Sequence, residues 1–463
     1  MRILLIAHDF PPIPSPQSLR WAYLARELAL RGHTIQVLTS VSSHSMEGFP
    51  SLPQAVNVCR VSGDPLSRCA EFLKHRHANK RAWRWTSSRQ AGANAPPPRS
   101  ASVERPHAVE NPDSHRLNWK GRLASGALRA AGRLLRSLPL FPDDRGLWYA
   151  PASKEACRIV EEFSPDVVVS SHEPATSLQV GLFLKRRSDT PWVADLGDPV
   201  LAAYTPLKWK KRALQLESSV LKTAELVTVT TAQALELLEN RHAPRPAAIR
   251  RISVVTQGFE DREAHQRPDP SCLYDMHRLE ILYTGTFYEF RRPEPVLAAL
   301  AELPDVRLSI ASVAIPQWLW PALRQAGDRV RLLGFLPHQQ ALAVQKGADV
   351  LLNIANQDAA QVPGKVYEYL GSARPILHLS AGAGDASAEL IRSKGRGWVC
   401  DGNVAEIVEL LDRLLRLKRE SGDIAALNPT SVAEFGWSQI GEKYSRLLTS
   451  LVSERDGEVR RVD

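Results

Sequence analysis

Cysteine is scarce in this sequence, and its placement argues against two kinds of structural centre. The five cysteines are odd in number, lie far apart and never form a Cys-x-x-Cys pair, so neither a disulfide scaffold nor a zinc site is expected. We therefore expect no bound metal and a reducing, cytoplasmic environment. The five residues are Cys59, Cys69, Cys157, Cys272 and Cys400.

Long apolar runs are missing as well. The N-terminal MRILLIAHDFPP contains one basic residue and a short apolar run that ends at His8. This run is too brief for the core of a signal peptide and far shorter than a membrane span. No other segment of the sequence predicts a transmembrane helix.

Several signatures of nucleotide and hydrolytic chemistry are also absent. The sequence has no P-loop, no zincin pair of histidines, no G-x-S-x-G turn, and no G-x-G-x-x-G motif after its first apolar run. Nicotinamide and ATP chemistry therefore lose most of their support, and no resident cofactor is expected.

The net charge of +9 is unevenly distributed. Residues 60–136 hold 16 of the 59 basic residues and only 5 of the 50 acidic ones, so the rest of the chain is slightly acidic. This basic stretch contains no recognisable nucleic-acid-binding module, and we expect no nucleic-acid partner. Because residues 60–140 contain an APPP run and little apolar periodicity, they predict a partly disordered insertion.

One part of this insertion, residues 116–138, does have a helical pattern. Apolar side chains form one stripe of RLNWKGRLASGALRAAGRLLRSL and arginines lie opposite, as in a helix that lies on anionic lipid. Three glycines weaken this helix by roughly 1 kcal/mol each relative to alanine. The alternative, a solvated helix that covers its own domain, stays open.

Outside the insertion, short apolar runs alternate with amphipathic stretches. Apolar runs without polar alternation are typical of parallel strands buried on both faces, and the intervening helices of right-handed crossovers. The sequence therefore predicts an α/β protein with two doubly wound sheets, one in residues 1–262 and one in residues 278–430, and a final amphipathic helix at 434–452. The predicted strands are RILLIA, TIQVLTS, DVVVSS, WVADL, LVTVTT and ISVVTQ, then LEILYTG, VRLSIAS, VRLLGFL, DVLLNIA, PILHLS and GWVC.

The loops that follow these strands are the expected place for chemistry. In open parallel sheets, ligands bind beyond the carboxyl ends of the strands, and two such domains create a cleft between them. The candidates are His172, Asp195 and Asp198 in the first domain, and Thr286, Arg291 and Arg292 in the second.

The stretch QVPGKVYEYLGSARPIL (361–377) predicts a short helix that begins at Pro363-Gly364. Its bare backbone N–H groups beside Gly364, Lys365 in the first turn, and the two nearby arginines are suited to a diphosphate. Glu368, one turn further on, is placed to accept hydrogen bonds from ribose hydroxyls. The alternative is that Lys365 and Glu368 are solvated helix residues.

Several segments, in this order, resemble glycosyltransferase family 4 of the GT-B fold. They are HDFPP with RWAYLARELALRGHTIQVLT, then PWVADLGDP, QGFE and VPGKVYEYLGSARPIL. The resemblance covers most of both domains but not residues 60–140. It implies two Rossmann-like domains facing across a cleft, with the C-terminal helix packing back on the N-terminal domain. It also implies a nucleotide-diphosphate sugar held mainly by the C-terminal domain, an acceptor held by the N-terminal domain, and no metal.

The resemblance assigns Glu368 as the second acid of a pair spaced eight residues apart, the one expected at the ribose. The first acid, which commonly contacts the donor sugar, falls at Ala360, and Asp358 is the nearest substitute. The family's basic pair for the diphosphate maps to Thr286 and Arg292. Because Thr286 is not basic, Lys365 or Arg291 is expected to supply the missing charge.

On the acceptor side, His172 is expected to contact the donor sugar or the acceptor, with Asp195 and Asp198 lining the same cleft. The alternative for these three residues is that they cap loops and turns.

Together these features predict a glycosyltransferase that uses a nucleotide-diphosphate sugar, and the family resemblance implies that transfer retains the anomeric configuration. Its expected acceptor is a glycan or lipid-linked glycan of cell-surface polysaccharide synthesis, reached at the inner membrane face if residues 116–138 bind anionic lipid. Two alternatives stay open. One is a nucleotide-sugar epimerase, which needs no acceptor, and the other is a catalytically degenerate sugar-nucleotide binder, suggested by Ala360 and Thr286.

Overall fold

The computed structural model describes residues 1–42, 48–63, 141–243, 251–262, 273–422, 424 and 430–462, with side chains described up to residue 455. The predicted interfacial helix at 116–138 and most of the basic insertion lie outside these residues.

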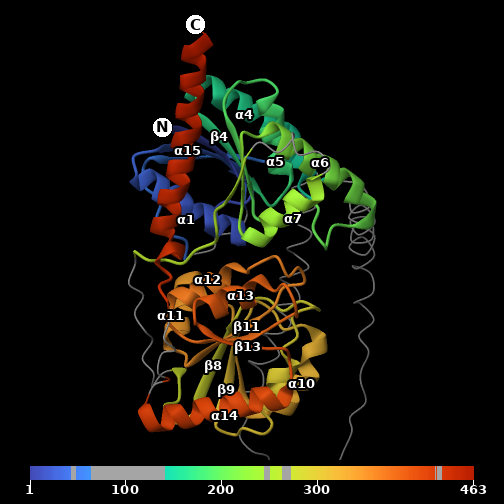
Figure 1. Ribbon diagram of the computed structural model, residues 1–463, viewed down its shortest axis with the longest axis vertical. Coiled ribbons are helices and arrows are strands. Elements are labelled where there is room, and N and C mark those ends of the chain that lie inside the picture. Colours follow the sequence, from blue (N-terminus) through green and yellow to red (C-terminus); the bar gives the residue numbers. More distant parts are fainter. Residues whose placement is uncertain are drawn as a thin grey trace, which may run out of the picture.

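The N-terminal domain is built on a parallel sheet of seven strands, in the order β3-β2-β1-β4-β5-β6-β7 (Figure 1). This order reverses next to β1, as in doubly wound folds, because successive crossovers run first to one side and then to the other. The strands are β1 (Arg2–Ile6), β2 (Thr34–Ser40), β3 (Val56–Val61), β4 (Val167–His172), β5 (Trp192–Leu196), β6 (Leu226–Val229) and β7 (Ile252–Val254). The helices are α1 (Pro16–Leu30), α4 (Tyr149–Phe163), α5 (Thr176–Lys185), α6 (Lys210–Thr223) and α7 (Ala232–His242).

The C-terminal domain repeats this design with a parallel sheet of six strands, in the order β10-β9-β8-β11-β12-β13. Its strands are β8 (Leu279–Thr284), β9 (Val306–Ala311), β10 (Val330–Gly334), β11 (Val350–Ile354), β12 (Ile376–Leu379) and β13 (Gly397–Cys400). Its helices are α9 (Glu294–Ala299), α10 (Trp320–Ala326), α11 (His338–Gly347), α12 (Gly364–Gly371), α13 (Ala386–Ser393) and α14 (Val404–Ser421).

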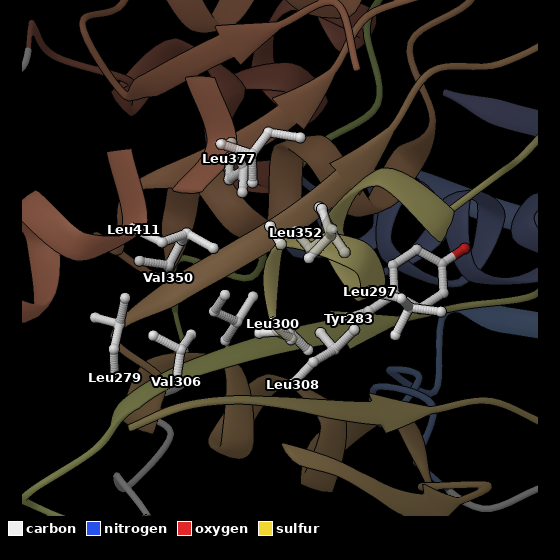
Figure 2. Packing of buried hydrophobic residues seen from close by; sticks show 14 of the residues in the cluster. Leu279, Tyr283, Leu297, Leu300, Val306, Leu308, Val350, Leu352, Leu377 and Leu411 are labelled. Carbon is white, nitrogen blue, oxygen red and sulfur yellow. The ribbon is translucent and has the colours of Figure 1, made fainter. Parts of the chain in front are cut away.

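Both sheets are buried on their two faces, as the apolar runs predicted. Figure 2 shows this packing on one face of the second sheet, where Leu279, Val306 and Val350 from three neighbouring strands meet Leu300, directly after α9, and Leu411 of α14. The predicted α/β class with two Rossmann-like domains is confirmed.

Strand β3 is the element that the apolar pattern did not identify. Its sequence VNVCRV pairs in parallel with β2 at the edge of the sheet, and several of its side chains are exposed. An edge strand has one neighbour and one open side, so it does not need the continuous apolar run that marks a central strand.

The last helix, α15 (Trp437–Val462), returns to the N-terminal domain and lies along α1 (Figure 1). Trp437 stacks on Tyr23 with ring centroids 5.4 Å apart, and Tyr444 meets the edge of Trp21 at 5.8 Å. The predicted return of the C-terminal helix is therefore observed. Among the residues whose structure is described, no helix has the length and apolar character that crossing a membrane requires.

A buried ion pair ties α1 to the middle of the first sheet. Arg20 donates to both carboxylate oxygens of Asp195 at 3.0 and 2.9 Å, and neither side chain is exposed. Arg20 also donates to the carbonyls of Val255 and Thr256, where the chain leaves the sheet. Thr228 of β6 donates to Asp195 at 2.6 Å. The Arg20–Asp195 pair thus joins a helix, two strands and the start of the interdomain segment.

Replacing Asp195 with asparagine would remove the negative charge and leave Arg20 buried beside a neutral amide. Breaking a buried pair in this way costs about 3 to 5 kcal/mol of unfolding free energy. We expect urea denaturation of Asp195→Asn to show a loss of that order. The matched control is Asp189→Asn, the same change at an exposed position before β5. Equal stability of the two variants would contradict the anchoring role of the pair.

Candidate functional site

The two domains touch through the elements that lie at the carboxyl ends of their strands. Thr231, at the start of α7, donates to the carbonyl of Ala360 at 2.8 Å. Gln233 donates to Glu389 of α13 at 2.7 Å, and the Tyr23 hydroxyl lies 3.3 Å from Nε2 of His338. Residues far apart in the sequence therefore share the region where sequence analysis placed the chemistry.

Helix α12 begins in this region, directly after Pro363. No side chain caps its first turn, so its N-terminal backbone dipoles favour an anion. The helix ends with Gly371, as the sequence predicted, and Ser372 provides the C-cap.

Lys365 lies in the first turn of α12 with its ammonium group buried and without a hydrogen-bond partner among the described residues. Its Nζ lies 3.9 Å from the ring centroid of Tyr283, at the end of β8. Burial, and then the positive charge of Arg291, lower the pKa of Lys365 well below its usual value, while Glu368 partly opposes this shift. A buried cation of this kind gains most from a bound anion.

Arg291 is the second cation of the site. Its guanidinium donates to the side chain of Asn356 at 3.3 Å and to the carbonyl of Thr286 at 3.4 Å, and its Nε is buried without a partner among the described residues. It also lies over the ring of Tyr288, 5.1 Å from the centroid. Thr286 therefore contributes its backbone to the site by positioning Arg291.

Arg292 does not join these two cations. It pairs with Glu294 at 3.2 Å and lies over the ring of Trp318, 4.6 Å from the centroid. Arg291 and Arg292 are adjacent in the sequence but contact different residues. A family motif alone does not tell which of the two contacts Asn356.

The Glu368 carboxylate is held by two side chains of α11. Nδ1 of His338 lies 3.8 Å from one of its oxygens, and the Gln345 amide donates to the other at 3.3 Å. Asp358, the nearest acid to Ala360, instead accepts from the backbone N–H of Ala360 at 3.0 Å and shapes its own turn.

On the N-terminal side, the loops after β4 and β5 bring two carboxylates to one hydroxyl. The Tyr204 oxygen lies 2.5 Å from Glu173 and 2.8 Å from Asp198. Burial, and then the negative charge of Glu173, raise the pKa of Asp198 to about 6, although the Tyr204 hydrogen bond opposes this rise. One hydroxyl proton cannot serve both carboxylates, so the pair is set up to hold an additional proton.

His172 is fixed beside this pair. Its Nδ1 lies 2.7 Å from the carbonyl of Asp198, so Nδ1 donates and Nε2 carries the lone pair when the ring is neutral. Asp195 does not belong to the group, because its carboxylate is enclosed by Arg20 and Thr228 beneath the loop. Sequence analysis had not selected Glu173 or Tyr204. Glu173 directly follows the selected His172, and this position in a loop after a strand was the only sequence feature that pointed to it.

No group of three or more histidine, cysteine or acidic side chains that is able to hold a metal ion occurs within the described parts of the chain.

Residues 17–255 match the sequence profile of the glycosyl transferase 4-like domain. A search of curated protein sequences finds no match.

Solved structures similar to this chain share its whole two-domain architecture at low sequence identity. HepE from Anabaena, solved in complex with UDP, is 14% identical with a TM-score of 0.59, over 97% of this chain and 100% of that one. Sucrose-phosphate synthase from Thermosynechococcus elongatus is 15% identical with a TM-score of 0.56, over 100% and 98%. A putative UDP-N-acetylglucosamine 2-epimerase from Listeria monocytogenes is 13% identical with a TM-score of 0.52, over 98% and 97%. At these identities the likeness shows the fold alone.

The shared hydroxyl gives a titration test of the carboxylate pair. Because the Tyr204 hydrogen bond lowers the pKa of Asp198, we expect Tyr204→Phe to raise it above about 6. The measurement is the pH dependence of the Asp198 carboxyl resonance in protein labelled with ¹³C at aspartate, assigned with Asp198→Asn. Tyr149→Phe, which alters a tyrosine that packs against Phe183, is the control and should not move the titration. An unshifted or lowered pKa in Tyr204→Phe would contradict this arrangement.

Proposed function

The chain belongs to the glycosyl transferase 4-like family, and from this membership we propose that it transfers a sugar from a nucleotide-diphosphate sugar to a glycan or lipid-linked glycan. We further propose that transfer retains the anomeric configuration, as the family resemblance implies, and that it serves cell-surface polysaccharide synthesis. The three described cysteines are free thiols, which supports a reducing, cytoplasmic setting for this reaction.

The observation that carries the proposal is a pair of basic side chains with buried nitrogens, Lys365 in the first turn of α12 and Arg291 in the loop after β8. Among the described residues, neither Lys365 nor Arg291 forms an ion pair with a carboxylate, and each has a buried nitrogen without a hydrogen-bond partner. Leaving such groups unpaired is costly, and a diphosphate supplies the charge and the acceptor oxygens that they lack. We assign the donor diphosphate to this place.

The same cations serve the chemical step. As the bond between the sugar and the diphosphate breaks, negative charge grows on the leaving diphosphate while the sugar carbon becomes oxocarbenium-like. Fixed cations and helix N–H groups stabilise that charge without reorganising, so they lower the barrier more than they favour the ground state. In this proposal Lys365 and Arg291 supply the charge that Thr286 lacks, while Arg292 pairs with Glu294.

We assign Glu368 to the ribose of the nucleotide. Its two oxygens are held by His338 and Gln345, so the carboxylate is oriented before a ligand binds. A preoriented carboxylate accepts two hydroxyl hydrogen bonds with little loss of side-chain entropy.

We assign the acceptor hydroxyl to the Asp198 and His172 group on the N-terminal side. Asp198 accepts a hydrogen bond when ionised, and Nε2 of His172 is the ring nitrogen that is left to accept. Holding donor and acceptor between two domains supplies the orientation that a transfer between two substrates requires.

A nucleotide-sugar epimerase remains the second candidate, because the same fold occurs in a putative UDP-N-acetylglucosamine 2-epimerase. The two functions differ in their need for an acceptor. A transferase releases nucleoside diphosphate only when an acceptor is present, apart from slow hydrolysis, whereas an epimerase converts its substrate alone. Tight nucleotide binding with neither reaction would favour a degenerate binder.

The two adjacent arginines provide an internal comparison for the donor site. Loss of a charged hydrogen-bond donor to phosphate weakens binding by about 10-fold to 100-fold. We expect Arg291→Met to raise the Kd for UDP, or for whichever nucleoside diphosphate binds best, by this factor in isothermal titration calorimetry. Arg292→Met is the matched control and should bind almost as the parent protein does. A larger loss in Arg292→Met than in Arg291→Met would reverse the assignment.

Replacing Lys365 with methionine should have opposite effects on the stability of the protein and on its binding of nucleoside diphosphate. The fold lowers the pKa of Lys365, so the unfolded chain holds this proton more tightly, and stability should rise with pH between the lowered value and the usual lysine value. We expect Lys365→Met to be more stable than the parent below this window, to lose this pH dependence in urea denaturation, and to lose stabilisation by nucleoside diphosphate. A variant that is less stable and still stabilised by nucleotide would refute the role of Lys365.

A further inference from the structure

An exposed basic and apolar surface follows β5 and continues into the first turns of α6. We call it the 204–214 patch. Leu207 is 85% exposed, the highest value among the large apolar side chains of the described residues, and Tyr204 is 50% exposed. The patch consists of Tyr204, Leu207, Lys208, Lys210, Lys211, Arg212 and Leu214, all of them exposed.

Within the described parts of the chain, the cations of this patch have no acidic partners. The sequence from Pro199 to Leu216 contains no aspartate or glutamate. None of the four basic side chains forms an ion pair with another described residue; instead Lys208 and Arg212 lie over the ring of Trp209, 5.3 and 5.4 Å from its centroid. The patch therefore presents uncompensated positive charge.

The position of these cations in the helix further favours binding of an anion. Lys210, Lys211 and Arg212 occupy the first turn of α6, where the helix dipole is positive and cations are unfavourable. The helix has no acidic residue in that turn and no side-chain cap. An anionic partner would relieve both the repulsion among the cations and their conflict with the dipole.

We propose that the 204–214 patch docks on an anionic lipid surface. Leu207 enters the boundary between head groups and acyl chains, Tyr204 lies at the head-group level, and the lysines contact lipid phosphates. A nucleic acid fits less well, because successive bases need several open aromatic faces, whereas Trp209 is already covered by two cations and by Phe141 and Tyr204 is only half exposed. Leu207, the most exposed apolar side chain of the patch, also has no favourable contact to offer a phosphate backbone.

This surface adjoins the acceptor side of the domain. Tyr204 exposes part of its ring while its hydroxyl contacts Glu173 and Asp198. In Figure 1, α6 lies at the outer edge of the N-terminal domain and leaves both domains free to face each other. A lipid-linked acceptor held in the bilayer would present its head group next to these carboxylates. The docking itself does not depend on the proposed transfer reaction.

The test is cosedimentation of the full-length chain with vesicles of phosphatidylglycerol and phosphatidylcholine. The variant Leu207→Ser, Lys210→Ser, Lys211→Ser should partition at least about tenfold more weakly, since each lysine near an anionic surface contributes severalfold. Binding by the parent chain should weaken with added salt and be absent on pure phosphatidylcholine. The changed residues lie outside the assigned donor and acceptor contacts, so nucleotide binding should be unaffected.

The matched control is Leu417→Ser, Arg413→Ser, Arg416→Ser. It removes one exposed leucine and two exposed cations from α14, in the other domain, and should bind vesicles as the parent does. Thermal unfolding of both variants verifies that they are folded.

Four outcomes would overturn the proposal. The first is that the parent chain does not bind vesicles, and the second is that the variant and the control lose vesicle binding equally. The third is that vesicle binding is lost only when Arg129, Arg133 and Arg136 are changed to serine, which would assign lipid contact to residues 116–138. The fourth is a patch that supports RNA binding or self-association, measured by filter binding and light scattering, in a chain that does not sediment with vesicles.

Discussion

The pairing of Arg20 with Asp195 is the constraint on which the N-terminal half of the site depends. Asp195 lies on β5, and three residues later the chain has turned into the loop that carries Asp198. Because Arg20 also holds the carbonyls of Val255 and Thr256, the same contact positions the segment that leads to the C-terminal domain. Every guanidinium nitrogen of Arg20 donates at least one hydrogen bond, which makes this buried pair tolerable, and the direction of these bonds leaves little freedom for β5 to shift along α1.

The C-terminal half of the site uses charge in the opposite way. Lys365 and Arg291 are close enough for one to lower the pKa of the other, yet neither has an acidic partner among the described residues. Such an arrangement reduces the stability of the empty protein and is maintained by the surrounding fold, especially by β8 and α12. Arg20 is paired and stabilises the scaffold, whereas the ammonium group of Lys365 is buried without an acidic partner among the described residues, and in the proposed function a bound diphosphate supplies that partner.

The sequence was sufficient for the fold, and it selected several residues that the structure brings together in the candidate site. Continuous apolar runs identified the central strands because both faces of those strands are buried, and the pattern missed β3 because an edge strand is partly exposed. The helix start at Gly364 could be predicted from local backbone chemistry. The choice between Arg291 and Arg292 could not, since it depends on which side chain meets Asn356 and which meets Glu294 and Trp318. Asp195 likewise could not be separated from the loop acids by sequence, since its burial depends on the tertiary contact with Arg20.

The contacts between the domains explain how the chain accommodates alanine at position 360. Thr231 binds the carbonyl of Ala360, a backbone group that any residue provides, so the domains meet here whether or not an acid is present. His338 forms a second link, since one of its nitrogens lies near Tyr23 of α1 and the other near Glu368 of α12. A rigid-body opening of the domains would break the Thr231–Ala360 hydrogen bond and the contact between His338 and Tyr23. The orientation of the Glu368 carboxylate is therefore coupled to the contact between the domains through His338, and alanine at position 360 leaves that coupling in place.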